Sequence, residues 1–453
     1  MSELMRPIEF DKLIKWSFKE CNSQGSIFGV KKEKFYKNKS GTNIEVFGDK
    51  ISSPIGPAAG PNAQLSQNII ASYLAGSRFI ELKTVQKMDG EELRKCIARP
   101  CINVEDEGYN VEWSTELTVE EAFDEYVKGY IAIHILSKEM EISDTKDFLF
   151  SMSVGYDLEG IKTDKINNYI EGMKDASNSK VWKECINWVR NNMAEFKKFS
   201  EEDLNKIDPR VCSTICLSTL HGCPPEEIER IAKYLISEKK INTYIKCNPT
   251  LLGYEFTRNI LNKMGYGYVT FDDHHFKNDL QWSEAVLMIN RLIEFSKENK
   301  IGFGVKLTNT FPVKIANNEL PGEEMYMSGR ALYPLTISLA SKMSEEFKGR
   351  LPISFSGGAD YFNIVDIFNT GIQPITVATT ILKPGGYERL KQLSEVLEPH
   401  LTGKFHGLNI KGLGILSKNV EYNKNNLKET RPVKSRKTDS ILPLFDCAKA
   451  PCN

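Results

Sequence analysis

The sequence predicts an α/β protein built as a (β/α)8 barrel, and three observations support this fold. Short apolar or β-branched runs alternate with helical patterns from residue 51 to about residue 397. Several of these runs lack polar–apolar alternation, as strands that are buried on both faces of a parallel sheet do. An open doubly wound sheet would show the same alternation, but the length of the region favours the barrel, which typically takes about 250 residues.

Nine segments have the composition of buried strands, although a barrel has eight places. They are SSPIGPAAG (52–60), FIELKT (79–84), FLFSMSV (148–154), CSTICLST (212–219), NTYIKCN (242–248), GYVTF (267–271), GFGVKLTN (302–309), LPISFSG (351–357) and QPITVATT (373–380). Either GYVTF or one of its neighbours therefore lies outside the barrel. Helical periodicity and acidic or proline starts predict helices over 224–239, 283–300 and 333–347.

The remaining segments extend this barrel. We expect an N-terminal cap of mixed structure over 1–50 and a barrel over 51–397. Two long stretches between strands, 85–147 and 157–211, are read as insertions that carry acidic helices. Residues 398–440 are expected to form a linker or extended arm, because their second half is polar, lysine-rich and poor in apolar residues.

The composition is that of a soluble globular protein. Of the 453 residues, 41% are hydrophobic and 26% are charged, and the net charge is -1. Without a basic excess, nucleic acid is not an expected partner. The N-terminus has no apolar signal region and no apolar run reaches about 18 residues, so we expect a cytoplasmic location without a membrane span. In that compartment the ten cysteines are expected to be thiols or ligands rather than disulfides.

Two neighbouring strand ends have the residues of a phosphate site. Gly357 and Gly358 end one strand, and Thr379 and Thr380 end the next. Glycines let backbone N–H groups approach an anion, and a following helix directs its positive end at the same place. The loops after the last two strands of such barrels often bind phosphate. The alternative is a tight turn that simply needs glycine.

The segment STLHGCPPEEIE (218–229) follows a strand and starts a helix. Cys223 would lie on the ligand face near a helix N-terminus, which lowers a thiol pKa, so it is a candidate general acid or base. A buried, inert thiol is the alternative. We expect His221, in the same segment, to be a hydrogen-bonded structural residue.

Three lysines, Lys83, Lys246 and Lys306, occupy apolar strands. A buried lysine is costly without a counter-charge, so three of them indicate an electronegative ligand in the barrel mouth. Asn248, Asn309 and Thr310 follow two of these strands and could bind the polar edge of a ring.

Two further segments contain the residue types of metal ligands. Adjacent residues on a strand point to opposite faces, so we expect the DDHH run (272–275) to be a polar loop rather than a metal site. Cys447 and Cys452, in the last segment 441–453, could be half of a metal or iron–sulfur site or two free thiols, and their spacing alone does not decide.

These motifs, taken in order, carry a resemblance. SSPIGPAAG, FIELKTV, LHGCPP, YIKCNPT, TNT before MSGRALYPLTI, ISFSGG and VATTIL make region 51–397 similar to the dihydroorotate dehydrogenase-like FMN barrel, especially the flavin domain of dihydropyrimidine dehydrogenase. A closer similarity, to the N-terminal part of the selenate reductase subunit family, spans nearly the whole chain. It includes IEFDKLI, EWSTELT, MSVGYDLEGI, LSTLHGCPPEEIE, NPTLLGY, LPGEEMYMSGRALYP and LKPGGY.

The resemblance implies roles for individual residues. Ala58, Ala59 and Gly60 would line a flavin, and Lys83 and Lys246 would approach its ring or ribityl oxygens. Gly329, Gly357, Gly358, Thr379 and Thr380 would hold the FMN phosphate. Asn110, Asn248, Asn309 and Thr310 would face the substrate, and Cys223 would transfer the proton. The sequence departs from the pattern at LSTLHGCPP, where the barrel family has N-L-S-C-P, and at TNT, which directly follows VKL.

The resemblance also implies a function and partners. Members of the selenate reductase subunit family continue into an iron–sulfur segment and an FAD and NAD(P)H module, and DCAKAPC resembles the start of that segment, with Cys447 and Cys452 as cluster ligands. We expect a subunit or fragment of a flavin and iron–sulfur oxidoreductase that passes electrons between FMN and a small, heterocyclic or C=C, substrate. One alternative is a flavin-free scaffold that docks partner subunits, and another is a lyase or isomerase acting on a phosphorylated ligand.

Overall fold

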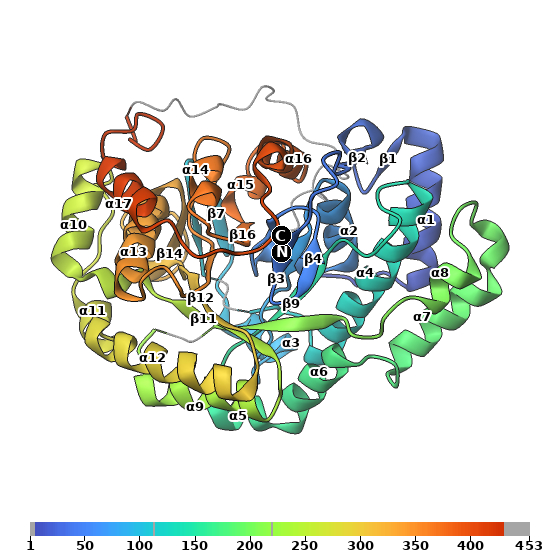
Figure 1. Ribbon diagram of the computed structural model, residues 1–453, viewed down its shortest axis with the longest axis horizontal. Coiled ribbons are helices and arrows are strands. Elements are labelled where there is room, and N and C mark those ends of the chain that lie inside the picture. The colour runs from blue at the N-terminus through green and yellow to red at the C-terminus, as the bar shows by residue number, and fades with distance from the viewer. Residues whose placement is uncertain (1–4, 112–113, 219–220, 430–453) are drawn as a thin grey trace.

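Eight parallel strands surrounded by helices form the centre of the computed structural model, which describes residues 5–111, 114–218 and 221–429 (Figure 1). The strands follow the order β5-β16-β15-β12-β11-β10-β9-β6. Their bounds are β5 Ile55–Pro57, β6 Phe79–Glu81, β9 Leu149–Val154, β10 Cys212–Leu217, β11 Asn242–Cys247, β12 Phe303–Leu307, β15 Ile353–Phe355 and β16 Ile375–Val377. The predicted (β/α)8 barrel is therefore confirmed.

The first and last strands of this order lie side by side, which nearly closes the barrel. The backbone N–H of Arg78 donates to the carbonyl of Ile55 at 2.8 Å, directly beside β5 and β6. A side chain at Gly56 would begin 1.4 Å from the carbonyl oxygen of Phe79. Only glycine allows the two strands to approach this closely.

The ninth strand candidate is the one outside the barrel. Residues 267–271 (GYVTF) form no strand and lie between α10 (Tyr254–Lys263) and α11 (His274–Asn278). Their apolar side chains are used in a different way, since Phe271 packs against Tyr254, Phe276 and Phe311.

Helices cover the barrel strands. The predicted helices at 224–239, 283–300 and 333–347 are observed as α9 Pro225–Ser237, α12 Trp282–Asn299 and α13 Tyr333–Glu346. The others that pack around or above the strands are α2 Ser66–Leu74, α3 Gly90–Cys96, α4 Val119–Glu139, α5 Leu158–Lys162, α6 Asp164–Lys174, α7 Lys180–Asn191, α8 Glu201–Asn205, α14 Ile364–Asn369, α15 Thr379–Leu382 and α16 Glu388–Leu397. The predicted insertions thus contain α3 and α4 in the first and α5 to α8 in the second.

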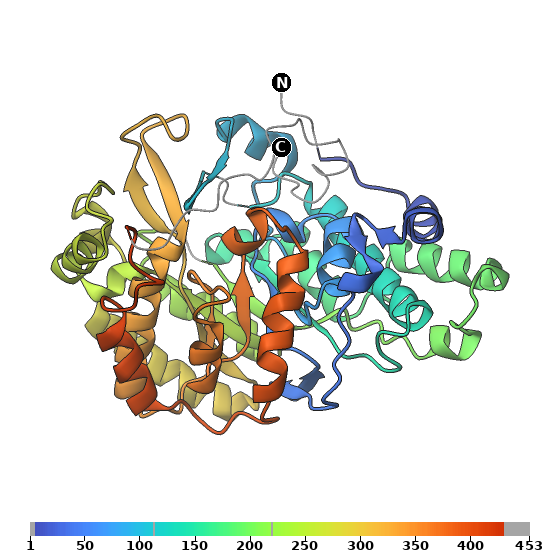
Figure 2. The same ribbon diagram turned by 90° about the horizontal axis from the view of Figure 1, so that it is seen from above.

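A small antiparallel sheet, which we call the hood, stands over one end of the barrel (Figure 2). Its strands follow the order β13-β14-β8-β7, with bounds β13 Phe311–Lys314, β14 Glu324–Gly329, β8 Glu107–Asn110 and β7 Ile102–Val104. Because these strands follow the carboxyl ends of β6 and β12, the hood covers the face on which barrel enzymes bind ligands.

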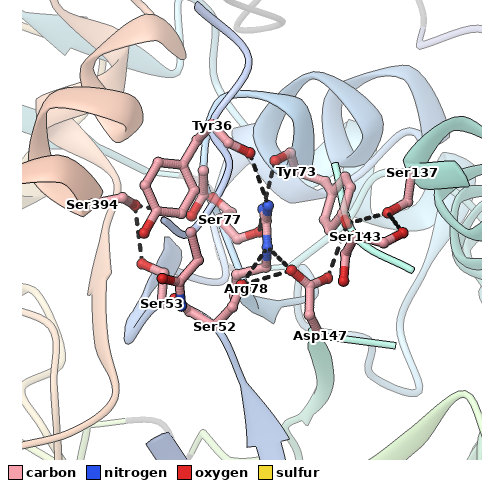
Figure 3. A network of polar contacts seen from close by, with 12 residues as sticks. Tyr36, Ser52, Ser53, Tyr73, Ser77, Arg78, Ser137, Ser143, Asp147 and Ser394 are labelled. Carbon is pink, nitrogen blue, oxygen red and sulfur yellow. Dashed lines mark hydrogen bonds and ion pairs between the residues drawn. The ribbon is translucent and has the colours of Figure 1, made fainter. Parts of the chain in front are cut away.

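The opposite face is held by a buried polar network around Arg78 (Figure 3). The fully buried guanidinium donates from Nε to Asp147 at 2.7 Å and from Nη1 and Nη2 to the carbonyls of Tyr73 and Tyr36 at 2.8 and 3.2 Å. Ser52 donates to the same carboxylate at 2.6 Å. Since these residues precede β5, β6 and β9 or belong to the cap, the network ties the amino ends of three strands to the N-terminal segment.

The described segments before and after the barrel contain further elements. The cap contains α1 Phe10–Gln24 and the hairpins β1 Ser26–Ile27 with β2 Val30–Lys31 and β3 Ile44–Val46 with β4 Asp49–Ile51. The segment expected to be an arm contains a helix, α17 Ile410–Asn419, which packs against α13. Cys447, Cys452 and the whole of 441–453 lie outside the described residues. Within the described residues, no helix is long and apolar enough to cross a membrane.

Candidate active site

A cavity of about 190 Å³ lies between the hood and the carboxyl ends of the barrel strands. The loops that follow β5, β6, β10, β12, β15 and β16 line it, together with Lys246 of β11 and with β7, β8 and β14 of the hood. Its lining contains all the predicted site residues that the structure describes except Asn248 and Cys223: Ala58, Ala59, Gly60, Lys83, Asn110, Lys246, Asn309, Thr310, Gly329, Gly357, Gly358, Thr379 and Thr380.

One corner of the cavity is made of backbone amides. Among the described residues, none accepts a hydrogen bond from the N–H groups of Gly357, Gly358 or Ala359. The N–H groups of Thr379 and Thr380 are also free of helical partners, because they begin α15. The Thr380 hydroxyl donates to the carbonyl of Ala359 at 2.8 Å and joins the two loops. The result is a concave set of donors that suits an anion.

The glycines of this corner are also required by the fold. Gly358 has a φ of +73°, and a Cβ there would lie 2.4 Å from the carbonyl oxygen of Gly329. A Cβ at Gly357 would lie 2.0 Å from the hydroxyl of Thr336. Both positions therefore need glycine whether or not an anion binds, so substituting them cannot test a phosphate site cleanly.

The three strand lysines have different surroundings. Lys306 is buried and pairs with Glu81 at 2.5 Å, and it also donates to Thr376 at 2.7 Å. Burial alone would raise the pKa of Glu81, but the ammonium groups of Lys306 and Lys246 hold it below its ordinary value. Lys306 thus has a counter-charge inside the barrel and is not in the cavity lining. Lys83 and Lys246 do line the cavity. Lys246 is half-buried and has no hydrogen-bond acceptor among the described residues.

His221 was not among the predicted site residues, yet it lines the cavity. Its Nδ1 lies 2.6 Å from Asp279 Oδ2, so the expected hydrogen bond is present. His275, from the DDHH run, makes an edge contact with the His221 ring at 5.1 Å. The LHGCPP segment and the DDHH run could have pointed to these residues, but nothing in the sequence shows that the two segments meet.

Cys223 has a different position from the one expected of a proton-transferring thiol. It is half-buried and outside the cavity lining. Burial, followed by the charges of Glu227 and Asp157, raises its pKa to about 11. The helix N-terminus therefore does not dominate the environment of this thiol.

Asn248 lies behind the lining and orients a residue within it. Its side-chain carbonyl accepts from Asn309 at 2.7 Å, and its amide donates to Asp279 at 3.0 Å. Asn110 reaches the cavity from β8 and contacts the Tyr326 carbonyl at 3.4 Å. Ion pairs fix the hood edge nearby, since Asp106 pairs with Arg330 and with Lys428, the latter at 2.9 Å.

Comparisons with known proteins agree with this architecture. Residues 28–428 match the family model described as the N-terminal TIM-barrel domain of the oxidoreductase YgfK. YgfK proteins of Escherichia coli K12 and O157:H7 are each 44% identical over 464 aligned residues. The alignment covers 100% of this chain but 45% of each relative, so the chain spans less than half of their length.

Among solved structures, a ligand-free DHODH from Eimeria tenella has a TM-score of 0.50 and 12% identity. The match covers 89% of this chain and 98% of that one, and at this identity it supports the fold alone. The family model, by contrast, covers most of the chain and the loops that form the cavity. The chain belongs to the family of N-terminal TIM-barrel domains of the oxidoreductase YgfK.

Proposed function

We propose that this chain is the FMN-binding barrel of a larger oxidoreductase and that its cavity brings the flavin together with a small substrate. One observation carries the proposal: a single cavity at the carboxyl ends of the strands combines an amide-lined corner with two lysines in its wall. This combination fits a ligand with an anionic end and an electron-accepting ring.

The amide corner would hold the phosphate. The N–H groups of Gly357, Gly358, Thr379 and Thr380, which have no acceptor within the described part of the chain, supply donors. Gly329 brings the hood backbone close to them. The Ser328 hydroxyl lies 2.7 Å from that of Thr379 and ties the hood to this corner. Donors fixed in this way bind an anion without reorganising first.

The lysines would hold the flavin ring. Lys83 follows β6 and Lys246 lies in β11, and both line the cavity, while Ala58, Ala59 and Gly60 have small side chains on which a flat ring can rest. When bound, FMN supplies hydride or single-electron transfer. A lysine beside the ring favours the negative charge of its reduced form.

The hood side of the cavity would hold the substrate. Asn110, Asn309 and Thr310 present amide and hydroxyl groups there, and Asn248 fixes the orientation of Asn309. Amide groups both donate and accept hydrogen bonds, which suits a planar heterocycle with alternating N–H and C=O groups. We therefore propose a small heterocyclic or C=C substrate.

More than half of each YgfK relative lies outside the region that matches this chain, and that part could contain an electron source. We propose that electrons reach the barrel from iron–sulfur, FAD and NAD(P)H sites in a further module or partner chain. Cys447 and Cys452 would provide the first cluster ligands of that module. Cluster reconstitution with the full chain and the Cys447→Ser variant would test this part.

The flavin assignment is tested at Lys246. The Lys246→Met substitution keeps an unbranched side chain of similar size and removes the charge. It should weaken FMN binding about tenfold or more, because hydrogen bonds to charged groups contribute about 1.5–3 kcal/mol. Lys297→Met, at an exposed lysine of α12, is the matched control. Affinities are measured by the quenching of flavin fluorescence.

Equal FMN affinity in Lys246→Met and the unmodified protein would remove the lysine from the proposed site. If neither protein bound FMN, the flavin-free scaffold would become the better account. The lyase or isomerase alternative would be supported by turnover of a phosphorylated ligand without any change in flavin redox state.

A further inference from the structure

The imidazole of His221 is held on three sides at the cavity. Asp279 contacts Nδ1 at 2.6 Å, the Tyr326 ring is stacked beside it at 6.0 Å and 17°, and His275 contacts it edge-on. The side chain is 11% exposed. These contacts give the ring one orientation, which is a requirement for positioned proton transfer.

Asp279 is itself fixed as a buried carboxylate. Its Oδ1 accepts from the N–H of Gly222 at 2.8 Å, and its Oδ2 accepts from Thr250 at 2.7 Å and from Asn248 at 3.0 Å. Burial would raise its pKa, but the hydrogen bonds from His221, Thr250 and Gly222 hold the pKa below its ordinary value. An ionised Asp279 can only accept a hydrogen bond, so it favours the His221 tautomer that carries the proton on Nδ1.

The second ring nitrogen remains available to a ligand. With a proton on Nδ1, Nε2 carries a lone pair, and no hydrogen-bond partner of Nε2 lies among the residues that the structure describes. His221 is part of the cavity lining, whereas Cys223, two residues further on, is not.

We propose that His221 transfers the proton in the reaction at this cavity, and that Asp279 is its positioning residue. This inference rests on the proposed function. On oxidation, a substrate C–H or N–H proton passes to Nε2 as that bond breaks, while a hydride leaves the neighbouring carbon for the flavin. The substrate gains a double bond, the flavin gains two electrons, and His221 returns its proton to solvent. Reduction of a substrate runs the same steps backwards.

A metal site is the rival interpretation of this cluster. Ligand atoms of His221, His275 and Asp279 lie within 4.8 Å of one another. However, both oxygens of Asp279 already accept hydrogen bonds, and His275 Nε2 lies 2.6 Å from Glu324. Because these groups have hydrogen-bond partners, the geometry favours proton transfer.

The first experiment measures the tautomer in the full chain by nitrogen NMR of labelled histidine. The six histidines give few signals, and the signal of His221 is the one that His221→Gln removes. We expect a proton on Nδ1, loss of that state in Asp279→Asn, and a shift of the His221 signal when FMN is added. A proton on Nε2, or no response to FMN in a protein that binds FMN, would overturn the inference.

The second experiment measures the reaction. Each FMN-loaded protein is photoreduced without oxygen and mixed with uracil or orotate as the probe, and flavin reoxidation is followed by absorbance. His221→Gln should slow reoxidation about 100-fold or more, the usual range for loss of a general acid. Asp279→Asn should also slow flavin reoxidation. The rate of photoreduction should be unchanged in both variants. His274→Gln, at an exposed neighbouring histidine, is the matched control.

The outcomes separate the two proposals. A normal rate in His221→Gln with a slow rate in Cys223→Ala would overturn this inference and leave the flavin site intact. Failure of the unmodified protein to bind FMN, or to be reoxidised by either probe, would overturn the proposed function and this inference with it. Stoichiometric Zn²⁺ binding that both His221→Gln and His275→Gln abolish would assign a metal site instead.

Discussion

At the scale of single residues, the barrel interior contains a charge pair where most barrels have branched apolar side chains. Glu81 and Lys306 are each about 2% exposed or less and meet at 2.5 Å, and the backbone N–H of Ala59 also donates to Glu81 at 3.2 Å. Through Ala59, this pair supports the loop that lines the proposed flavin site. The pair is therefore a link between the core and the cavity.

Removing one partner of this pair should be costly. We predict that Glu81→Gln lowers the free energy of unfolding by about 3–5 kcal/mol, because it leaves the Lys306 ammonium buried without a counter-charge. The double variant Glu81→Gln/Lys306→Met should regain most of the loss. Urea unfolding of the three proteins at pH 7 measures this, and a double variant no more stable than the single one would contradict the account.

Residue types at strand ends could be predicted from the sequence, but their neighbours could not. Gly357, Gly358, Thr379 and Thr380 directly follow buried strands, so topology alone brings them together. His221 and Cys223 lie two residues apart in one loop, and the sequence could not show which of them reaches the cavity. Asp279, which holds the His221 side chain at the cavity, comes from a segment more than fifty residues away.

At the scale of elements, α4 packs a histidine against the barrel wall. His134 is half-buried beside Tyr130 and Phe148, and its buried Nε2 has no hydrogen-bond partner among the residues that the structure describes. Burial, followed by the charge of Lys146, lowers its pKa to about 3. Burial at this place in α4 therefore favours the neutral imidazole in the folded protein.

This burial should make stability depend on pH. Between pH 6.5 and about 3 the unfolded chain binds a proton at His134 that the folded chain does not. The free energy of unfolding therefore decreases as the pH falls below 6.5. The loss is at most about 1.4 kcal/mol per pH unit. We predict that His134→Leu loses less stability than the unmodified protein between pH 7 and pH 5, as measured by urea unfolding; parallel losses would contradict this.

Strand elements were easier to predict than the elements that modify the barrel. The eight barrel strands are apolar because both of their faces are buried. The hood strands β7, β8, β13 and β14 are short hairpin strands within long connections, so no periodic pattern marked them. Helix α17 was missed because a polar segment follows it directly, although Ile410 and Leu413 give it an apolar side toward the barrel.

At the scale of the whole molecule, the two ends of the barrel have separate tasks. The Arg78 network fixes the amino ends of the strands, and the hood closes the carboxyl ends over the cavity (Figures 2 and 3). This division is usual for barrel enzymes, in which loops on one face can change while the other maintains the fold. Most residues of the proposed site therefore lie on loops, where the stability of the fold does not require apolar side chains.

The most direct test of the account is a paired titration of the full chain with FMN and with riboflavin, which lacks the phosphate. We predict one FMN bound per chain and binding of riboflavin at least about tenfold weaker, because the amide corner then has no anion to hold. Equal affinities would contradict the phosphate site, and binding of neither flavin would contradict the flavin barrel itself.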